Sequence, residues 1–473
     1  MTNVAEGFLR LATRLLPGSR NGHVPDYWLL TTVLMLVMFG TVMVFSASFA
    51  IGIEDEGGNS YYYLTRQLIW VTIGLAALLV TMNIDYHVWR RLALPGMVVV
   101  LILLAVVVLI PAAGVEAWGA TRWIPLGPLS FQPSEVAKPI LVIYLAEWLS
   151  QKGAKVRHFS YGLVPFAIFL GLLIGLVMLQ PDLGTSSVLA AIGIGMFLVA
   201  GADLMQFSGL IATGGVAFLV LALGASYRRA RILIFLNPDA DPLNLGWQLK
   251  QARLALGSGG IFGLGLGASR QKFAWLPAAQ NDAIFAVIGE ELGLIGCSFV
   301  LLLFLALGWR GYRVATKAPD AFGSLVAVGI VTWIIFQAAI NIGGITMTIP
   351  FTGVPLPFIS YGGTSLAVSL AAIGILLNVS RHTVDQPVFA EEEGTPNSTR
   401  SGSILRRFSR RKRTPVRAEM EARAPRRSTS RRERSESRPP VSLPTARGSS
   451  PRQSRSFGRA QTRRPTRTTR HWK

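Results

Sequence analysis

Residues 247–293 read WQLKQARLALGSGGIFGLGLGASRQKFAWLPAAQNDAIFAVIGEELG. This passage is polar and rich in glycine, and Asp282 stands in it directly before an apolar helix. The sequence on both sides consists of apolar runs and short connectors. An ionisable side chain at the edge of a membrane helix is costly enough to mark a functional site, so we look for chemistry here first.

Ten apolar runs dominate the rest of the chain. The 473-residue sequence is 51% hydrophobic and 15% charged, which is unusual for a soluble protein. Most runs approach the roughly 20 residues that cross a bilayer as a helix, and they lack the period-two alternation of a membrane barrel. We predict an all-α polytopic membrane protein without strands, with ten transmembrane helices inside residues 27–380, at about 28–50, 67–84, 92–110, 134–149, 161–179, 184–201, 205–224, 283–308, 323–347 and 358–379.

The positions of Lys and Arg predict the orientation, because short cytoplasmic loops carry an excess of them. Such residues occur in the N-terminal segment 1–26 and in connectors after the second, fourth and eighth runs, for example Arg90, Lys152 and Arg310. Alternating spans place all of them on one side, so both termini are predicted to be cytoplasmic. The extracytoplasmic side then receives one long loop, residues 225–283, between helices 7 and 8.

Residues 381–473 differ in composition from the membrane part. They hold 25 of the 46 Lys and Arg residues but only 8 of the 25 Asp and Glu residues. Arg, Ser and Pro dominate, so the segment buries too little apolar surface to fold, and we predict a disordered cytoplasmic tail. It would contact anionic lipids or an acidic cytoplasmic partner, or serve only as a solvated extension. We expect no nucleic-acid partner.

Histidine and cysteine leave few kinds of chemistry for the extracytoplasmic face. The only cysteine, Cys297, lies in an apolar run, which excludes disulfides and cysteine-rich metal sites. Ser-His-Asp hydrolysis and zinc catalysis are excluded on that face too, because all five histidines fall in cytoplasmic or tail segments (His23, His87, His158, His382 and His471). Proton transfer there must use carboxylates.

Asp282 is the first candidate among these carboxylates. It can act as a general base, or it can cap the helix that follows. Helical geometry places Glu290 about 80° around the helix axis and about 12 Å along it from Asp282, and Glu291 nearly opposite. Neither can form a close pair with Asp282, so structural roles are expected for both.

Basic residues of the long loop break the positive-inside pattern and need a use. They are the cluster Arg228-Arg229-Arg231 and the pair Arg270 and Lys272. The glycine run at 257–269 could let backbone N–H groups approach a phosphate, or serve as a hinge or for close helix packing. Gln248 precedes it on a short amphipathic helix.

Glu135 and Lys138 share one helix face at i, i+3, directly after Pro133. They form a local ion pair or present a charge to a substrate, and the spacing does not decide between these roles.

Four ordered motifs carry a resemblance to a known family. They are RWIPLGPLSFQPSEVAK (122–138), QPDLGTS (180–186), the QK…LP…DAIFAVIGEELG passage (271–293) and GVPLPFISYGGTSLAVSLAAIGILLNVSR (353–381). The membrane part resembles the SEDS (shape, elongation, division and sporulation) glycosyltransferases of bacteria, most closely their division branch, FtsW, with the elongation branch, RodA, as the alternative. The last 92 residues are not covered.

The resemblance implies an enzyme of the cytoplasmic membrane that polymerises lipid II on the outer face for septal wall synthesis. Lipid II is an undecaprenyl-pyrophosphate-linked disaccharide pentapeptide. The partners implied are a class B penicillin-binding transpeptidase and other divisome proteins. The rival functions are a lipid II flippase without polymerase activity and a scaffold that recruits these proteins.

The resemblance also implies the roles of individual residues. Asp282 matches the family's essential aspartate, and Trp123, Glu135 and Lys138 are expected to bind substrate, Lys138 at the pyrophosphate. We assign further substrate contacts to three residues of the long loop, Gln248, Arg270 and Lys272. A divalent cation, Mg²⁺ or Mn²⁺, is expected only at the pyrophosphate, without a protein metal site.

Three residues around Asp282 depart from the family pattern. Ala278 replaces an acidic residue, Gln280 a histidine and Ala283 a phenylalanine. The missing carboxylate weakens any proposal that several protein oxygens hold a metal beside Asp282.

Overall fold

The structure of the protein is a computed structural model. It describes residues 23–384, apart from 56–57, 111–114, 118–119, 127–128, 225, 238, 240, 242–244 and 274. The predicted tail lies outside the described residues from 385 onward, as does most of the N-terminal segment. Their predicted properties therefore stay predictions.

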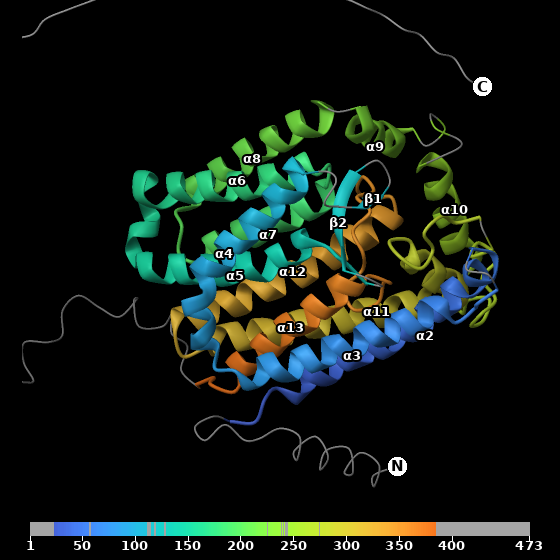
Figure 1. The fold of residues 1–473 in the computed structure, drawn as a ribbon, viewed down its shortest axis with the longest axis horizontal. Helices are drawn as coiled ribbons and strands as arrows, with labels where there is room; N and C mark the ends of the chain where they lie inside the picture. Colours follow the sequence, from blue (N-terminus) through green and yellow to red (C-terminus); the bar gives the residue numbers. More distant parts are fainter. Residues whose placement is uncertain are drawn as a thin grey trace, which may run out of the picture. The chain divides into compact units, whose positions relative to one another are not determined.

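Each of the ten predicted apolar runs coincides with a helix. These helices are α2 (Tyr27–Asp55), α3 (Tyr62–Asn83), α4 (Tyr86–Leu109), α5 (Pro133–Lys152), α6 (Val164–Leu179), α7 (Leu183–Val199), α8 (Leu204–Gly224), α11 (Ile284–Thr316), α12 (Ala321–Ile345) and α13 (Gly363–Ser380). Within the described residues, seven helices are long and apolar enough to cross a membrane, and Leu183–Val199 and Leu204–Ala217 are shorter apolar helices. The fold is that of a helical, multi-pass membrane protein (Figure 1).

One end of the helices collects the basic connectors. The backbone N–H of His23 donates to the Arg381 carbonyl over 2.8 Å, and that of Val384 donates to the Lys317 carbonyl over 2.8 Å. Arg310 forms an ion pair with Asp26 at 3.5 Å. The start of α2 therefore lies beside the ends of α11 and α13. This arrangement is consistent with the prediction that both ends of the membrane part lie on one side.

Three strands lie at the opposite end, so the prediction that the chain has no strands is wrong. β1 (Val115–Ala117), β2 (Ala120–Leu126) and β3 (Leu129–Phe131) form an antiparallel sheet in the order β1-β2-β3. Runs of three to seven residues in a connector rich in Gly and Pro are too short to display a period-two pattern. The sheet is held by Arg122, whose Nε donates to the Gln180 carbonyl over 2.8 Å.

Helix ends differ from the ends of the apolar runs. α11 continues to Thr316, so Arg310, which we placed in a connector, lies inside the helix. Similarly, Arg90 belongs to α4. Basic side chains are compatible with a helix that extends beyond the hydrocarbon layer, whereas hydropathy marks only the apolar stretch. α13 begins at Gly363 rather than at 358, because the chain makes turns up to that point.

The long loop is partly helical. It contains α9 (Ser226–Leu236) and α10 (Leu245–Ser258), and α10 is the predicted short helix that carries Gln248. Residues 259–273 and 275–283 follow as turns and irregular chain that lead into α11.

Candidate active site

Asp282 does not cap the helix that it precedes. The N-cap of α11 is Ala283, and within the described residues no side chain caps this helix end. Asp182 at α7 and Asp320 at α12 show the contrast, since each accepts a hydrogen bond from the first turn of its helix. The capping alternative for Asp282 is therefore wrong, and its carboxylate is left for another role.

Two polar groups fix the backbone around Asp282. Nδ2 of Asn341, on α12, donates to the carbonyls of both Asp282 and Val354 over 2.8 Å. The Tyr361 N–H donates to the Gln280 carbonyl over 2.9 Å. α12 and the segment before α13 thus hold the turn that carries the carboxylate.

Arg231 of α9 is the cation beside Asp282. A β-carbon on Gly353, which has φ +73°, would lie 3.4 Å from Asp282 Oδ2 and 3.5 Å from Arg231 Nη1, so both side chains meet at this glycine. Arg231 Nη1 also donates to the Phe351 carbonyl over 3.0 Å. The loop 351–354 therefore positions an arginine against the candidate base.

Burial raises the pKa of the Asp282 carboxyl to about 6, against the opposing effects of its own backbone N–H, of the Arg231 charge and of the Ala283 N–H. The residue as a whole keeps partial exposure, whereas its Oδ1 atom is buried and has no hydrogen-bond partner among the described residues. Three neighbouring atoms are also buried without a hydrogen-bond partner among the described residues, namely Oε1 of Gln280, Oδ1 of Asn281 and Oγ1 of Thr352. Buried polar atoms normally have partners, so these four oxygens are acceptors left unsatisfied by the described residues. A carboxylate with a pKa near neutrality is suited to take up a proton.

Glu135 and Lys138 form the local ion pair that was one of the two alternatives. Lys138 Nζ lies 2.8 Å from Glu135 Oε1 and 2.7 Å from Oε2, and it donates to Gln337 Oε1 over 2.9 Å. Both side chains are buried. The Gln337 amide in turn donates to the Pro355 carbonyl over 2.9 Å. In this geometry Lys138 faces the protein interior, and it supports the loop that approaches Asp282.

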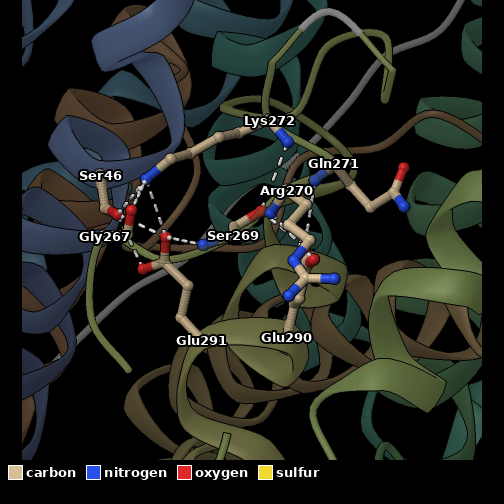
Figure 2. A network of polar contacts seen from close by, with 8 residues as sticks. All are labelled: Ser46, Gly267, Ser269, Arg270, Gln271, Lys272, Glu290 and Glu291. Carbon is tan, nitrogen blue, oxygen red and sulfur yellow. Dashed lines mark hydrogen bonds and ion pairs between the residues drawn. The ribbon is translucent and has the colours of Figure 1, made fainter. Parts of the chain in front are cut away.

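The glycine-rich segment binds the protein's own carboxylates (Figure 2). Arg270 N–H donates to Glu290 Oε1 over 3.0 Å, and the Gln271 N–H donates to Oε2 of the same residue over 3.4 Å. Ser269 donates its hydroxyl to Glu290 over 2.5 Å and its N–H to Glu291 over 3.3 Å. These three successive N–H groups, at the end of the glycine run and just beyond it, bind carboxylates that α11 supplies.

Lys272 completes this network. Its Nζ lies 3.1 Å from Glu291 Oε1 and 2.7 Å from the Gly267 carbonyl, and the Ser46 hydroxyl of α2 donates to Glu291 over 2.7 Å. Lys272 and Glu291 are both buried. The predicted substrate contact of Lys272 is thus replaced, in this geometry, by an internal ion pair that ties the long loop to α2 and α11.

The glycines allow the loop to pack directly on α11. The helix breaks at Gly293 (φ 64°, ψ −159°). A β-carbon on Gly259 would lie 1.9 Å from the Gly289 carbonyl oxygen, and one on Gly263 would lie 2.2 Å from that of Glu291. Of the alternatives for the glycine run, close helix packing is the one observed.

The side chains of the remaining predicted residues lie apart from this network. Trp123 is half-buried on β2, opposite Val115. Gln248 donates its amide to the Pro277 carbonyl over 3.3 Å, which attaches α10 to the chain before Asp282. The side chain of Arg270 is exposed.

Sequence reasoning did not select three residues that contact the Asp282 turn. They are Arg231, Asn341 and Gly353. Arg231 had a usable signal, because basic residues on the extracytoplasmic side are unexpected. Asn341 is one buried amide in an apolar helix, and only the fold shows which carbonyls it meets.

Among the described residues, the charged groups that meet at Gly353 are the Asp282 carboxylate and the Arg231 guanidinium. Among the described residues, no group of three His, Cys, Asp or Glu side chains could hold a metal ion. Mg²⁺ is often bound by one or two carboxylates together with substrate phosphates. Any divalent cation here would therefore be held mainly by substrate phosphates.

The comparisons with known proteins agree with this architecture. The family model described as cell cycle protein, FtsW/RodA/SpoVE, matches residues 27–385. Stage V sporulation protein E of Bacillus subtilis is 46% identical over 364 residues, covering 76% of this chain and 98% of the relative. A probable peptidoglycan glycosyltransferase FtsW of Trichlorobacter lovleyi is 44% identical, covering 75% of this chain and 93% of the relative.

Solved structures show the same relationship. A chain of a peptidoglycan synthase complex, described as coordinating polymerization and crosslinking, is 29% identical with a TM-score of 0.61, over 76% of this chain and 98% of that one. The rod shape determining protein RodA of Thermus thermophilus is 28% identical with a TM-score of 0.56, over 76% and 97%. The chain therefore belongs to the FtsW/RodA/SpoVE family of cell cycle proteins, which are the SEDS peptidoglycan glycosyltransferases.

Proposed function

We propose that the protein polymerises lipid II into glycan strands, with Asp282 as the general base. The observation that carries this proposal is a buried carboxylate with a raised pKa beside Arg231, at the end of the molecule away from the described histidines. A base has to be deprotonated at working pH and close to neutrality in pKa to be effective, and Asp282 meets both conditions.

The reaction joins two substrate molecules. The acceptor's GlcNAc 4-OH attacks C1 of the donor's MurNAc while the bond from C1 to the pyrophosphate oxygen breaks, with inversion from α to β. The hydroxyl proton passes to Asp282, and the lipid pyrophosphate leaves with the electron pair of the broken bond. Arg231 is placed to stabilise negative charge that develops near the carboxylate.

The membrane arrangement that suits this reaction has ten spans with both termini in the cytoplasm. This arrangement is supported by the contacts that bring His23, Arg381 and Lys317 to the same end of the helices. Asp282 then lies at the extracytoplasmic face, where the sugar and peptide of lipid II are exposed.

The cellular role that we propose is septal wall synthesis together with a class B transpeptidase. Identity of 40–44% to FtsW relatives supports the division role. The likeness to a chain of a synthase complex supports a transpeptidase partner. Depletion should give filamentous cells, whereas round cells would indicate the elongation role.

The activity test compares wild type with Asp282→Asn, incubated with lipid II and a transpeptidase partner. General bases contribute about 10²–10⁴-fold to rate, so we expect at least about a hundredfold loss of polymer. Leu302→Ala, at an exposed position in the middle of α11, is the control and should polymerise at a rate close to that of wild type. Wild-type polymerisation by Asp282→Asn would remove Asp282 from the mechanism.

One feature favours the flippase alternative, namely the break of α11 at Gly293, since transporters use discontinuous helices. The break is filled by the glycine-rich loop, however, and its carboxylates are bound internally. Movement of labelled lipid II across liposomes without any polymer would support the flippase over the polymerase.

A further inference from the structure

The loop that packs into the break of α11 carries exposed apolar side chains. Ile261, Phe262 and Leu266 are 60%, 79% and 63% exposed. They occur within one six-residue segment, whereas the adjoining Ser269 and Lys272 are buried. Concentrated apolar exposure of this kind marks a surface that contacts a membrane or a partner.

Backbone hydrogen bonds fix the depth of this segment. The N–H of Leu264 donates to the Glu290 carbonyl and that of Leu294 to the Gly260 carbonyl, each over 2.9 Å. From Gly293 to Trp309, which precedes the basic Arg310, the helix rises about 24 Å, which covers most of the roughly 30 Å hydrocarbon layer. The break therefore lies near a membrane surface, and the loop lies at that level.

The apolar surface of the loop continues a lipid-facing stripe. Ile295, whose N–H donates to the Ile261 carbonyl over 3.2 Å, is exposed, and so are Leu302, Leu305 and Trp309 at helical spacing further along α11. An exposed apolar stripe on a membrane-crossing helix faces lipid. The exposed Arg270 adds a cation at the polar end of the loop, where headgroup phosphates lie.

We propose that residues 261–266 form a membrane anchor, whose apolar side chains insert into the boundary between headgroups and acyl chains of the leaflet at the Asp282 end. The occupant is lipid of that leaflet. Because the same loop continues into the network of Glu290, Glu291 and Lys272, the anchor fixes the chain that leads to Asp282 relative to the membrane surface.

The single cysteine makes a direct test simple. In a Cys297→Ser background, an environment-sensitive fluorophore is attached to Phe262→Cys or Leu266→Cys in the full chain, reconstituted in phosphatidylethanolamine–phosphatidylglycerol vesicles. Asn59→Cys, at an exposed polar position near the same end, is the aqueous control. Leu302→Cys, in the lipid-facing stripe, is the membrane control.

The anchor predicts a specific quenching pattern. Labels at 262 and 266 should be quenched by aqueous iodide at least about threefold less than the label at 59, and most strongly by lipids spin-labelled near the headgroup end of the chain. The label at 302 should prefer mid-chain spin labels. Iodide quenching equal to that at 59 would refute the anchor. Protection from both iodide and spin-labelled lipids would also refute it, because protein would then cover the loop.

Discussion

The buried pair Lys272–Glu291 gives a quantitative prediction for Lys272→Met. The substitution keeps an unbranched chain of similar length and removes the ammonium group. Among the described residues, the Glu291 carboxylate then keeps the Ser46 hydroxyl at 2.7 Å and the Ser269 N–H at 3.3 Å as its hydrogen-bond donors. Removing one partner of a buried ion pair costs about 3–5 kcal/mol, because the other charge stays buried.

The neighbouring Glu290 indicates where in this range the cost falls. Its carboxylate is held by a hydroxyl and two N–H groups, which are all neutral donors. Neutral donors thus satisfy one buried carboxylate, so we expect a loss of about 3 kcal/mol, at the lower limit. An unfolding entropy of about 2.1 cal/mol/K per residue over the roughly 350 described residues corresponds to about 1.4 °C per kcal/mol. The apparent Tm in detergent therefore falls by about 4 °C.

The double variant Lys272→Met/Glu291→Gln tests the cause. It removes both charges and should recover to within about 1 kcal/mol of wild type, because a buried ion pair contributes little net stability against neutral groups of similar volume. Thermal unfolding at one scan rate measures all the variants. If the double variant melts as low as Lys272→Met, the loss comes from packing of the lysine stem and the electrostatic reasoning fails.

Three further outcomes follow from the site. Polymerisation should fall as pH drops through about 6, where Asp282 takes up a proton, and Arg231→Gln should move this limb of the pH–rate profile to higher pH because a lowering charge is lost. The pKa of Asp282 is raised from 3.8 to about 6 in the folded state, so wild type loses stability as pH rises through this window. Asn stays neutral at every pH. Asp282→Asn should therefore have a higher Tm than wild type at pH 8 but not at pH 4. Gly293→Ala should cost at least about 2 kcal/mol, since its β-carbon would meet the Gly263 nitrogen at 2.4 Å and φ is positive. Gly257→Ala, with open space around it, is its matched control, and equal melting of the two would contradict the packing argument.

Hydropathy was sufficient to locate the helices of the membrane part. A run of about 20 apolar residues has few options other than a membrane helix, and all ten runs proved helical. The short strands around Trp123 could not be predicted in this way. Their pairing depends on turns in a connector whose residues have no regular alternation.

The site was predictable in its carboxylate but not in its cations. Asp282 stands out because its position in the chain is itself unusual. Lys138 and Glu135 are three residues apart, whereas Lys272 and Glu291, and Arg231 and Asp282, are brought together by contacts between distant segments. A sequence shows that Lys138 and Lys272 are basic, but not that both face the interior.

This distribution of cations bears on the proposed mechanism. Lys138 and Lys272 form buried ion pairs with Glu135 and Glu291. Neither lysine could stabilise a departing pyrophosphate without breaking its ion pair. Arg231 differs, because the carboxylate beside it is the proposed base. When Asp282 takes the acceptor proton it becomes neutral, and the positive charge of Arg231 loses its local compensation at the moment when negative charge develops on the leaving group. With Ala278 in place of an acidic residue, no carboxylate at that position competes for this charge. Proton uptake by Asp282 and charge stabilisation by Arg231 would thus be coupled in one step.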